Sequence, residues 1–324
     1  MSKHMAPKGR TRGSRRRARL LLSLVLLLGG AELFFYPAVS AWMAQQSADR
    51  AIERALSNET RDVHRSDAQH EFAFKAGNAA YEYLDAYNQE VAAGEGEPIN
   101  DPWGMGSNKG ELLDIGLQDG MIGSVSIPVL GETLPLYMGA TDENMEKGAA
   151  VVAGTSAPLG GSDTNCVIAA HRGVWNGLRM FRDIENIQKG DRLTIRTPWG
   201  LLAYQAVEVA VIDSNDVDAV RVRAERDLVT LITCHPYGQN TKRYMVVFER
   251  VAHEGGVAGE VQSSDVAGFF LELVRPVLDL THRTDSPLLL FERILRVIGL
   301  LILALAIGML TASLKRCAGS GRCH

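Results

Sequence analysis

The chain has 324 residues, which is enough for one or two folded domains. Eleven of its 34 basic residues lie in two terminal tails, which leaves 23 basic residues against 38 acidic ones elsewhere, a net charge of −15. An acidic balance of this size argues against a nucleic-acid-binding protein. It fits either a plain solvated surface or a surface that meets a lysine-rich partner.

A basic tail and a long apolar segment open the chain. Residues 1–19 hold eight Lys or Arg residues and no acidic residue, and the apolar segment at 20–43 is interrupted by Glu32 and Pro37. About 20 apolar residues are enough to cross a bilayer, so this segment predicts a transmembrane anchor. A signal peptide that is cleaved near residues 38–41 is the alternative interpretation.

A second apolar segment covers residues 294–314, where Arg296 is the one charged residue, and a basic tail follows at 315–324. Its length predicts a C-terminal transmembrane helix, with a buried core helix as the alternative. Because basic residues flank each segment on its terminal side, we expect both tails in the cytoplasm and the region between them outside the cell membrane.

Three regions lie between the apolar segments. Residues 44–110 are typical of a helical stalk that ends in a glycine-rich loop, and residues 253–293 read as a linker. Residues 111–252 consist of short apolar and β-branched runs separated by Gly, Pro, Asn and Asp, a pattern that predicts a mainly β domain, either a barrel or a sandwich. The runs lie at residues 124–129, 151–153, 167–170, 192–196, 202–212 and 228–233.

Cys234 stands at the end of the last of these runs. Turn residues follow it, and a second apolar run begins at Tyr244, directly after Arg243. This arrangement predicts a β-hairpin that brings Cys234 at the end of one strand close to Arg243 at the start of the next. A thiol beside a guanidinium group suggests a nucleophile with an anion-stabilising partner.

A thiol needs a nearby base or positive charge, since only a few per cent of it is thiolate at neutral pH. His171 ends the run at 166–170 and precedes a glycine turn, a place where barrels carry site residues. His235 adjoins Cys234, but neighbouring strand residues point to opposite faces, so His171 is the preferred base. Cys166 is interpreted as a buried thiol, although two cysteines outside the cell ordinarily suggest a disulfide.

These residues resemble the signature of the sortases, membrane-anchored cysteine transpeptidases of Gram-positive bacteria with an eight-stranded β-barrel. The resemblance covers roughly residues 80–252 and centres on Thr230-Leu231-Ile232-Thr233-Cys234 with the downstream Arg243. It also includes Ala86-Tyr87-Asn88, Ile127-Pro128, Leu134-Pro135-Leu136-Tyr137, Gly154-Thr155-Ser156 and Ala170-His171-Arg172-Gly173. Two departures are His235, where the family more often has a smaller residue, and Cys166.

Asp101, Pro102 and Trp103 resemble the lid of class C, the pilus-assembling sortases, as does a C-terminal transmembrane helix. In that class the lid aspartate pairs with the catalytic arginine and the aromatic ring covers the cysteine. A tight turn with a buried tryptophan is the alternative interpretation of these three residues.

The resemblance implies that Cys234 as thiolate is the nucleophile, His171 as imidazolium the proton donor, and Arg243 the stabiliser of substrate or oxyanion, with Thr233 in the substrate-binding site. It implies cleavage of a Leu-Pro-x-Thr-Gly-like signal on pilin or surface proteins and transfer to a pilin lysine, with no cofactor or metal. The alternatives are a housekeeping sortase that uses peptidoglycan, a cysteine hydrolase and a non-enzymatic displayed domain.

Overall fold

A computed structural model of the chain describes residues 12–57, 79–96, 99, 120–175, 178–236, 238–251 and 287–318. The chain divides into two compact units, which are described separately. One unit runs from Ala41 to Ser263 and holds the β-structure, and the other combines residues up to Ser40 with residues from Ser264 onward.

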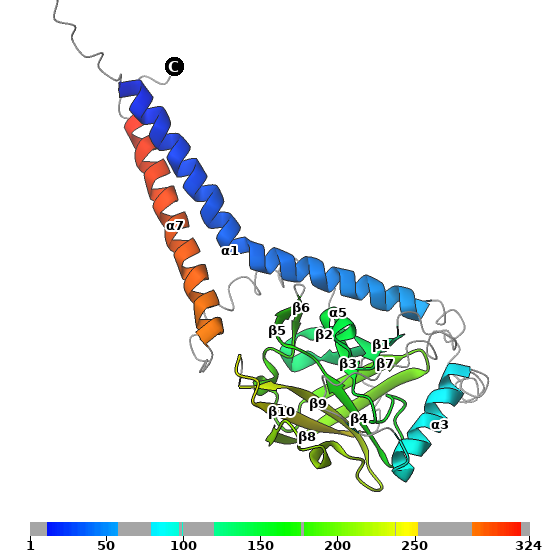
Figure 1. The fold of residues 1–324 in the computed structure, drawn as a ribbon. Coiled ribbons are helices and arrows are strands. Elements are labelled where there is room, and N and C mark those ends of the chain that lie inside the picture. Colours follow the sequence, from blue (N-terminus) through cyan, green and yellow to red (C-terminus); the bar gives the residue numbers. More distant parts are fainter. Residues whose placement is uncertain are drawn as a thin grey trace, which may run out of the picture. The chain divides into compact units, whose positions relative to one another are not determined.

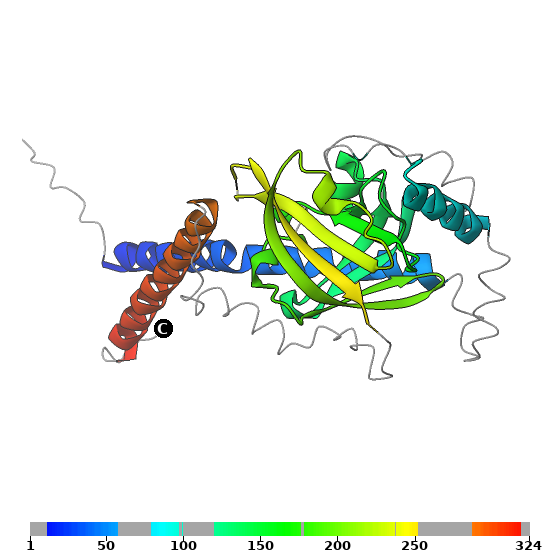
Figure 2. The ribbon, with the colours of Figure 1, turned by 90° about the horizontal axis from the view of Figure 1, so that it is seen from below.

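The first unit is a closed barrel of eight strands in the order β1-β2-β3-β4-β9-β10-β8-β7 (Figures 1 and 2). Two neighbouring pairs, β2 with β3 and β4 with β9, are parallel, and the others are antiparallel. The predicted mainly β, eight-stranded barrel is therefore confirmed. The strands are β1 (Met121–Ile127), β2 (Glu132–Met138), β3 (Ala149–Val151), β4 (Thr164–Ala169), β7 (Arg192–Thr197), β8 (Gly200–Asp213), β9 (Asp227–His235) and β10 (Lys242–Arg250).

Shorter elements lie in the connections between the barrel strands. A separate two-stranded sheet pairs β5 with β6, and the helix α5 and the 3-10 turns fill the connections. Their bounds are β5 (Arg172–Trp175), β6 (Leu178–Met180), α5 (Asp142–Lys147), η2 (Pro128–Leu130), η3 (Ile184–Asn186) and η4 (Asp218–Val220).

The barrel wall has two apolar faces because side chains alternate along each strand. One set, which includes Leu231 and Val246, joins the cluster that fills the barrel interior. The alternate set, which includes Ile232 and Met245, joins a second cluster with Met145 of α5. This second cluster lies on the outer face of the wall, so residues of β9 and β10 with the parity of Ile232 and Met245 point outward.

The helix α3 (Ala79–Ala93) is fixed to the barrel unit by its polar side chains. The Tyr87 hydroxyl accepts a hydrogen bond from the Gly154 amide at 3.0 Å. Buried Asn88 makes two hydrogen bonds with the backbone of Ala157, accepting from its N–H at 2.6 Å and donating to its C=O at 3.2 Å. Tyr81 packs edge-on against Trp199, with ring centroids 5.8 Å apart.

The helix α1 (Arg12–Ser57) contributes its later residues to the barrel unit. Gln45 donates a hydrogen bond from Nε2 to the Thr133 carbonyl at 2.9 Å, and Ala48 belongs to the interior cluster. The first described part of the predicted stalk is thus a helix packed on the barrel, while residues 58–78, 97–98 and 100–110 of that region lie outside the described residues.

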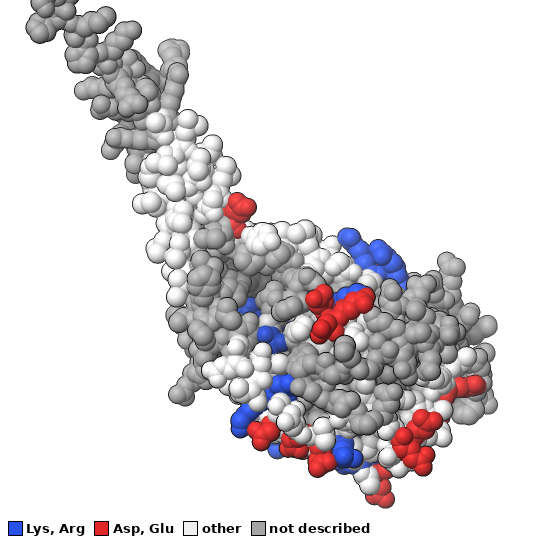
Figure 3. All heavy atoms as spheres, viewed as in Figure 1, with Lys and Arg blue, Asp and Glu red and all other residues white. Residues whose placement is uncertain are grey.

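The second unit contains the start of α1 and the helix α7 (Pro287–Ala318), which meet at glycines. A Cβ atom added to Gly30 would lie 3.1 Å from Ile302 Cγ2 and 3.2 Å from the Gly299 carbonyl, so the absence of side chains permits this approach. On the face of the barrel unit that Figure 3 shows, positive and negative side chains are interspersed over the described surface. In the part of the chain that the structure describes, no helix combines the length and apolarity needed to cross a bilayer, so the two predicted spans are not confirmed.

We expect Asn88→Ala to lower the free energy of unfolding by about 1–3 kcal/mol, because it removes the partner of the buried Ala157 N–H and one of the two hydrogen bonds to the Ala157 carbonyl. Urea unfolding measures this change. Gln89→Ala is the matched control, since the Gln89 side chain bonds to Asp85 on the exposed side of the same helix. Equal stability of the two variants would contradict the anchoring role of Asn88.

Candidate active site

Cys234 and Arg243 lie directly opposite each other on neighbouring strands. β9 and β10 are antiparallel, and the register pairs Cys234 with Arg243 and Ile232 with Met245. Directly opposed residues have Cβ atoms about 4.5–5.5 Å apart and share one face of the sheet. Both side chains are buried, Cys234 to 8% exposure and Arg243 to 4%, and by alternation both belong to the outer face. The predicted hairpin is therefore confirmed.

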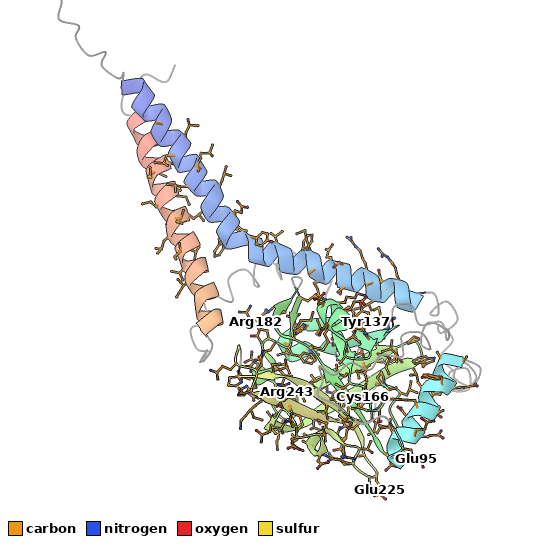
Figure 4. All side chains as sticks on the ribbon, viewed as in Figure 1. Glu95, Tyr137, Cys166, Arg182, Glu225 and Arg243 are labelled. Atoms are coloured by element: carbon orange, nitrogen blue, oxygen red, sulfur yellow. The ribbon has the colours of Figure 1, made fainter. Side chains whose placement is uncertain are left out.

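The guanidinium of Arg243, which Figure 4 labels, is oriented by backbone carbonyls of the turn and of the first residue of β10. Its Nη1 atom donates hydrogen bonds to the carbonyl oxygens of Asn240 and Lys242, both at 3.1 Å. Because a guanidinium is planar and its five N–H donors have fixed directions, two bonds at one nitrogen restrict where the others point. The group provides a fixed positive charge beside the thiol.

His171 reaches the same site from β4. The parallel ladder between β4 and β9 pairs Ala169 with Ile232, and the Ala170 amide still donates to the Ile232 carbonyl at 3.4 Å. Continuing this register places His171 alongside Cys234. Ala169 belongs to the outer-face cluster, so the alternation also turns His171 outward. The structure thus brings the three predicted catalytic residues together at one end of the barrel and on one face.

The surroundings of His171 keep its imidazole mainly neutral. Burial lowers its pKa below the ordinary value of 6.5, and the nearby carboxylates of Asp142 and Glu146 oppose this shift. Both carboxylates belong to α5, which begins after Thr141, whose hydroxyl caps the helix by accepting from the Asn144 amide at 3.3 Å. A neutral imidazole at pH 7 can accept the proton of the thiol.

Thr233 is almost fully buried, with 1% exposure. Its hydroxyl donates a hydrogen bond to the Ala170 carbonyl at 2.8 Å, so it connects the residue before Cys234 to the residue before His171. The Thr233 side chain therefore links the end of β9 to the end of β4. Its predicted contact with substrate stays a prediction. The predicted lid residues Asp101, Pro102 and Trp103 lie outside the described residues.

Cys166 lies within β4 and belongs to the interior cluster, away from the outer-face site (Figure 4). Its thiol is 3% exposed, and burial, with a smaller contribution from Asp227, raises its pKa strongly. Neither Cys166 nor Cys234 forms a disulfide, so the interpretation of Cys166 as a buried thiol is confirmed. Among the described residues, no group of His, Cys, Asp and Glu is arranged to hold a metal ion.

A polar cluster next to Cys234 was not expected from the sequence. Arg172 forms an ion pair with Glu185 at 2.7 Å, and its Nη1 lies 2.8 Å from His235 Nδ1. Because a guanidinium only donates, Nδ1 accepts and the His235 proton sits on Nε2. Burial and then the Arg172 charge lower the pKa of His235, which favours this neutral form. One signal for this cluster was available from the sequence, namely that Arg172 directly follows His171. The contact with Glu185 could not be predicted, because Glu185 is distant in sequence.

Comparison with known proteins identifies the family. The family described as "Sortase domain" matches residues 125–251. A solved structure of the complex of Streptococcus agalactiae sortase C1 and MTSET is 30% identical, covers 61% of this chain and 97% of its own, and has a TM-score of 0.51. The chain belongs to the sortase family. A solved sortase C structure from Streptococcus pneumoniae is 26% identical over 63% of this sortase and 97% of its own chain, with a TM-score of 0.52.

Both solved structures are sortases of type C, so the predicted class C membership is confirmed. Among curated proteins, sortase D of Bacillus subtilis is 26% identical over 132 residues, which is 40% of this chain and 63% of that protein. This sortase therefore spans about three fifths of the length of the curated relatives it matches first.

We expect iodoacetamide to modify Cys234 and to leave Cys166 unmodified in the folded protein. Cys166 is buried in the barrel interior and its raised pKa keeps the thiol protonated, whereas Cys234 lies at a strand end on the outer face. Mass spectrometry of the peptides after brief labelling distinguishes the two sites, and labelling in denaturant provides the control in which both react. Equal labelling of both cysteines in the folded protein would contradict this assignment.

Two histidines should make stability depend on pH. The pKa values of His171 and His235 are lowered in the folded protein, so below about pH 6.5 the unfolded chain binds more protons than the folded one. Their contribution is present above that pH and is lost as the pH falls. We expect the melting temperature to fall between pH 7.5 and pH 5.5. A double variant, His171→Asn with His235→Asn, should show a shallower fall, and an unchanged slope would refute this account.

Proposed function

We propose that this sortase is a cysteine transpeptidase that cleaves a Leu-Pro-x-Thr-Gly-like sorting signal and joins pilin subunits through lysine isopeptide bonds. The observation that carries the proposal is the cross-strand pair of Cys234 and Arg243, with His171 aligned beside it by the β4–β9 register. The three residues supply a nucleophile, a fixed cation and a base on one face.

The first half-reaction forms a thioester. His171 accepts the proton of the Cys234 thiol as the sulfur attacks the threonine carbonyl of the signal, and a tetrahedral oxyanion forms. Collapse of this intermediate breaks the Thr–Gly amide bond, and His171 returns the proton to the departing glycine amine. The thioester retains the energy of the amide bond well enough for transfer to a second amine.

Arg243 stabilises the reaction through its position opposite Cys234. Its guanidinium is nearly excluded from solvent, where a charge interacts more strongly with a developing oxyanion than it does in water. The bonds to the Asn240 and Lys242 carbonyls hold it near the nucleophile, so little reorganisation is needed when the oxyanion appears.

The second half-reaction transfers the acyl group to an amine. We assign the acceptor to a lysine of a pilin subunit: its neutral ε-amine attacks the thioester, an isopeptide bond forms, and the Cys234 thiol is regenerated. Support for a pilin comes from the similar sortase C structure of Streptococcus pneumoniae, which is described as giving insight into pilin substrate specificity. In this proposal Asp101, Pro102 and Trp103 form a lid over the groove, as the resemblance to class C implies.

The proposal also places the enzyme at the cell membrane, with the barrel outside and both termini in the cytoplasm. Apolar residues with basic flanks at 20–43 and 294–314 support this location. On the described helices that contain these segments, several large apolar side chains are exposed, among them Leu21, Val25, Leu301 and Leu305 at 59–65%. Such side chains gain by contact with lipid.

We expect Cys234→Ala to abolish both cleavage of a sorting peptide and its transfer to an amine, because no other described thiol lies at the site. Arg243→Lys should lose most activity, about tenfold or more, although the charge is kept, since an ammonium lacks the planar fork. Mass spectrometry of the products with a pilin lysine peptide as acceptor measures both steps.

Cys166→Ala is the matched control and should remain active, because Cys166 faces the barrel interior. Transfer by folded Cys234→Ala would refute the proposed nucleophile. Transfer to a peptidoglycan amine in place of lysine would instead identify a housekeeping sortase, and release of the free acid alone would identify a hydrolase.

A further inference from the structure

The side chain of Arg172 joins the two strand ends that carry His171 and Cys234. Arg172 follows His171 in the chain, and its Nη1 donates a hydrogen bond to the Cys234 carbonyl oxygen at 3.3 Å. The side chain is only 6% exposed. A buried guanidinium therefore connects the backbone next to the base with the backbone of the nucleophile.

Two further partners hold this guanidinium in place. Its Nη2 lies 2.7 Å from Glu185 Oε1 on η3, and its Nη1 lies 2.8 Å from His235 Nδ1 on β9. Directional donors and a planar group fix the orientation of Arg172 when several acceptors surround it. Glu185 also lies 3.4 Å from His235 Nδ1, so the three side chains form one compact cluster.

This cluster lies on the side of the strands opposite to the catalytic face. His235 and Tyr244 have the parity of the inward-pointing residues, and their rings lie 5.7 Å apart. Cys234 and Arg243 have the outward parity. A substrate bound on the outer face is therefore separated from His235 by the strand itself, and Arg172 acts on Cys234 through the backbone carbonyl.

The sheet alone does not extend to the two catalytic residues. The last pair of the β4–β9 ladder is Ala169 with Ile232, and after it the link continues through the Ala170 amide, the Thr233 hydroxyl and finally Arg172. Thr233 bonds one residue before His171 and Cys234, and Arg172 bonds at Cys234 itself. The Arg172 bond is thus the last connection in this series.

We propose that Arg172, held by Glu185 and His235, is a positioning residue that keeps Cys234 aligned with His171 for the transpeptidation proposed above, on which this inference rests. Proton transfer between the thiol and the imidazole requires donor and acceptor within a few tenths of an ångström of hydrogen-bond distance. Because Arg172 reaches Cys234 through its backbone carbonyl, and the contacts with Glu185 and His235 hold it there, its loss should reduce kcat and leave KM nearly unchanged.

The experiment compares Arg172→Gln and Arg172→Lys with wild type. Arg226→Gln is the matched control, since Arg226 forms a comparable two-bond ion pair with Glu249 at the opposite end of β9. The readouts are kcat and KM for a Leu-Pro-x-Thr-Gly peptide and the rate of Cys234 alkylation by iodoacetamide as a function of pH. Thermal unfolding establishes that each variant is folded.

We expect Arg172→Gln to lower kcat about ten- to a hundredfold, as small misplacements of reacting groups do, with KM within about twofold of wild type. Its alkylation profile should move to higher pH, because a thiol that is not aligned with the imidazole ionises less readily. Arg172→Lys should recover only part of the loss. Full recovery with lysine would show that charge alone matters and would overturn the proposal, as would wild-type kcat in folded Arg172→Gln.

A second pair of variants tests the cluster if Arg172→Gln does not fold. His235→Ala removes an acceptor of Arg172, whereas His235→Asn offers an amide oxygen close to the position of Nδ1. We expect kcat to fall on the order of tenfold in His235→Ala and to recover in His235→Asn. Equal kcat values in His235→Ala and wild type would overturn the proposal.

Because alkylation of Cys234 requires no peptide, the experiment can refute the proposed transpeptidation and the positioning role of Arg172 independently of each other. If wild type transfers no sorting peptide while the alkylation profile still shifts in Arg172→Gln, the proposed function fails and the alignment of thiol and imidazole stands. If wild type transfers the peptide but neither kcat nor the profile responds to Arg172→Gln, only the positioning role fails.

Discussion

The pairing of β9 with two different neighbours is the constraint on which the site depends. β9 is bonded to β4 in parallel and to β10 antiparallel, so the far ends of β4 and β9 and the start of β10 meet at one rim of the barrel. His171, Cys234 and Arg243 lie at these three positions. A shift of either register by one residue would move one of these three side chains to the barrel interior. The interior cluster and the outer-face cluster both oppose such a shift, because it would turn the apolar side chains of the shifted strand to the opposite face of the wall.

Strand alternation also separates the residues proposed for the chemistry from the residues proposed to position them. In the proposed function the outward residues carry out the chemistry, and the cluster of Arg172, Glu185 and His235 lies on the other side of the strands. The carboxylates of α5 act on His171 from the outer side and oppose the effect of burial on its pKa. His171 and Cys234 therefore each have polar neighbours on a different structural element, and the closure of the barrel brings these elements together.

Much of the barrel could be predicted because its strands alternate and are bounded by turn residues. The runs that lead to Cys234 and His171 carried this signal, and the hairpin with Arg243 followed from the turn at residues 236–240. β2 gave a weaker signal, since Pro135 lies in its middle and cannot donate to a ladder. The short strands β5 and β6 hold too few residues to show a period.

The polar cluster was harder to predict for a different reason. Glu185 meets Arg172 and His235 only after the chain has passed through the β5–β6 hairpin and η3, and no local pattern encodes that contact. The packing of residues 41–57 on the barrel is a similar case, because the same helical pattern serves an exposed stalk or a packed helix. Tertiary contacts decide both, and single-sequence patterns do not contain them.

The interior location of Cys166 has a consequence for the chemical durability of the enzyme. Cys166 pairs with Val229 on β9, five residues before Cys234, which separates the two thiols by about 16 Å along the strand. They also point to opposite sides of the barrel wall. A disulfide requires Cα atoms within about 7 Å, so the folded chain cannot close a bond between them. In an oxidising environment, the Cys234 thiol is thereby protected from disulfide formation with the other cysteine of its own domain.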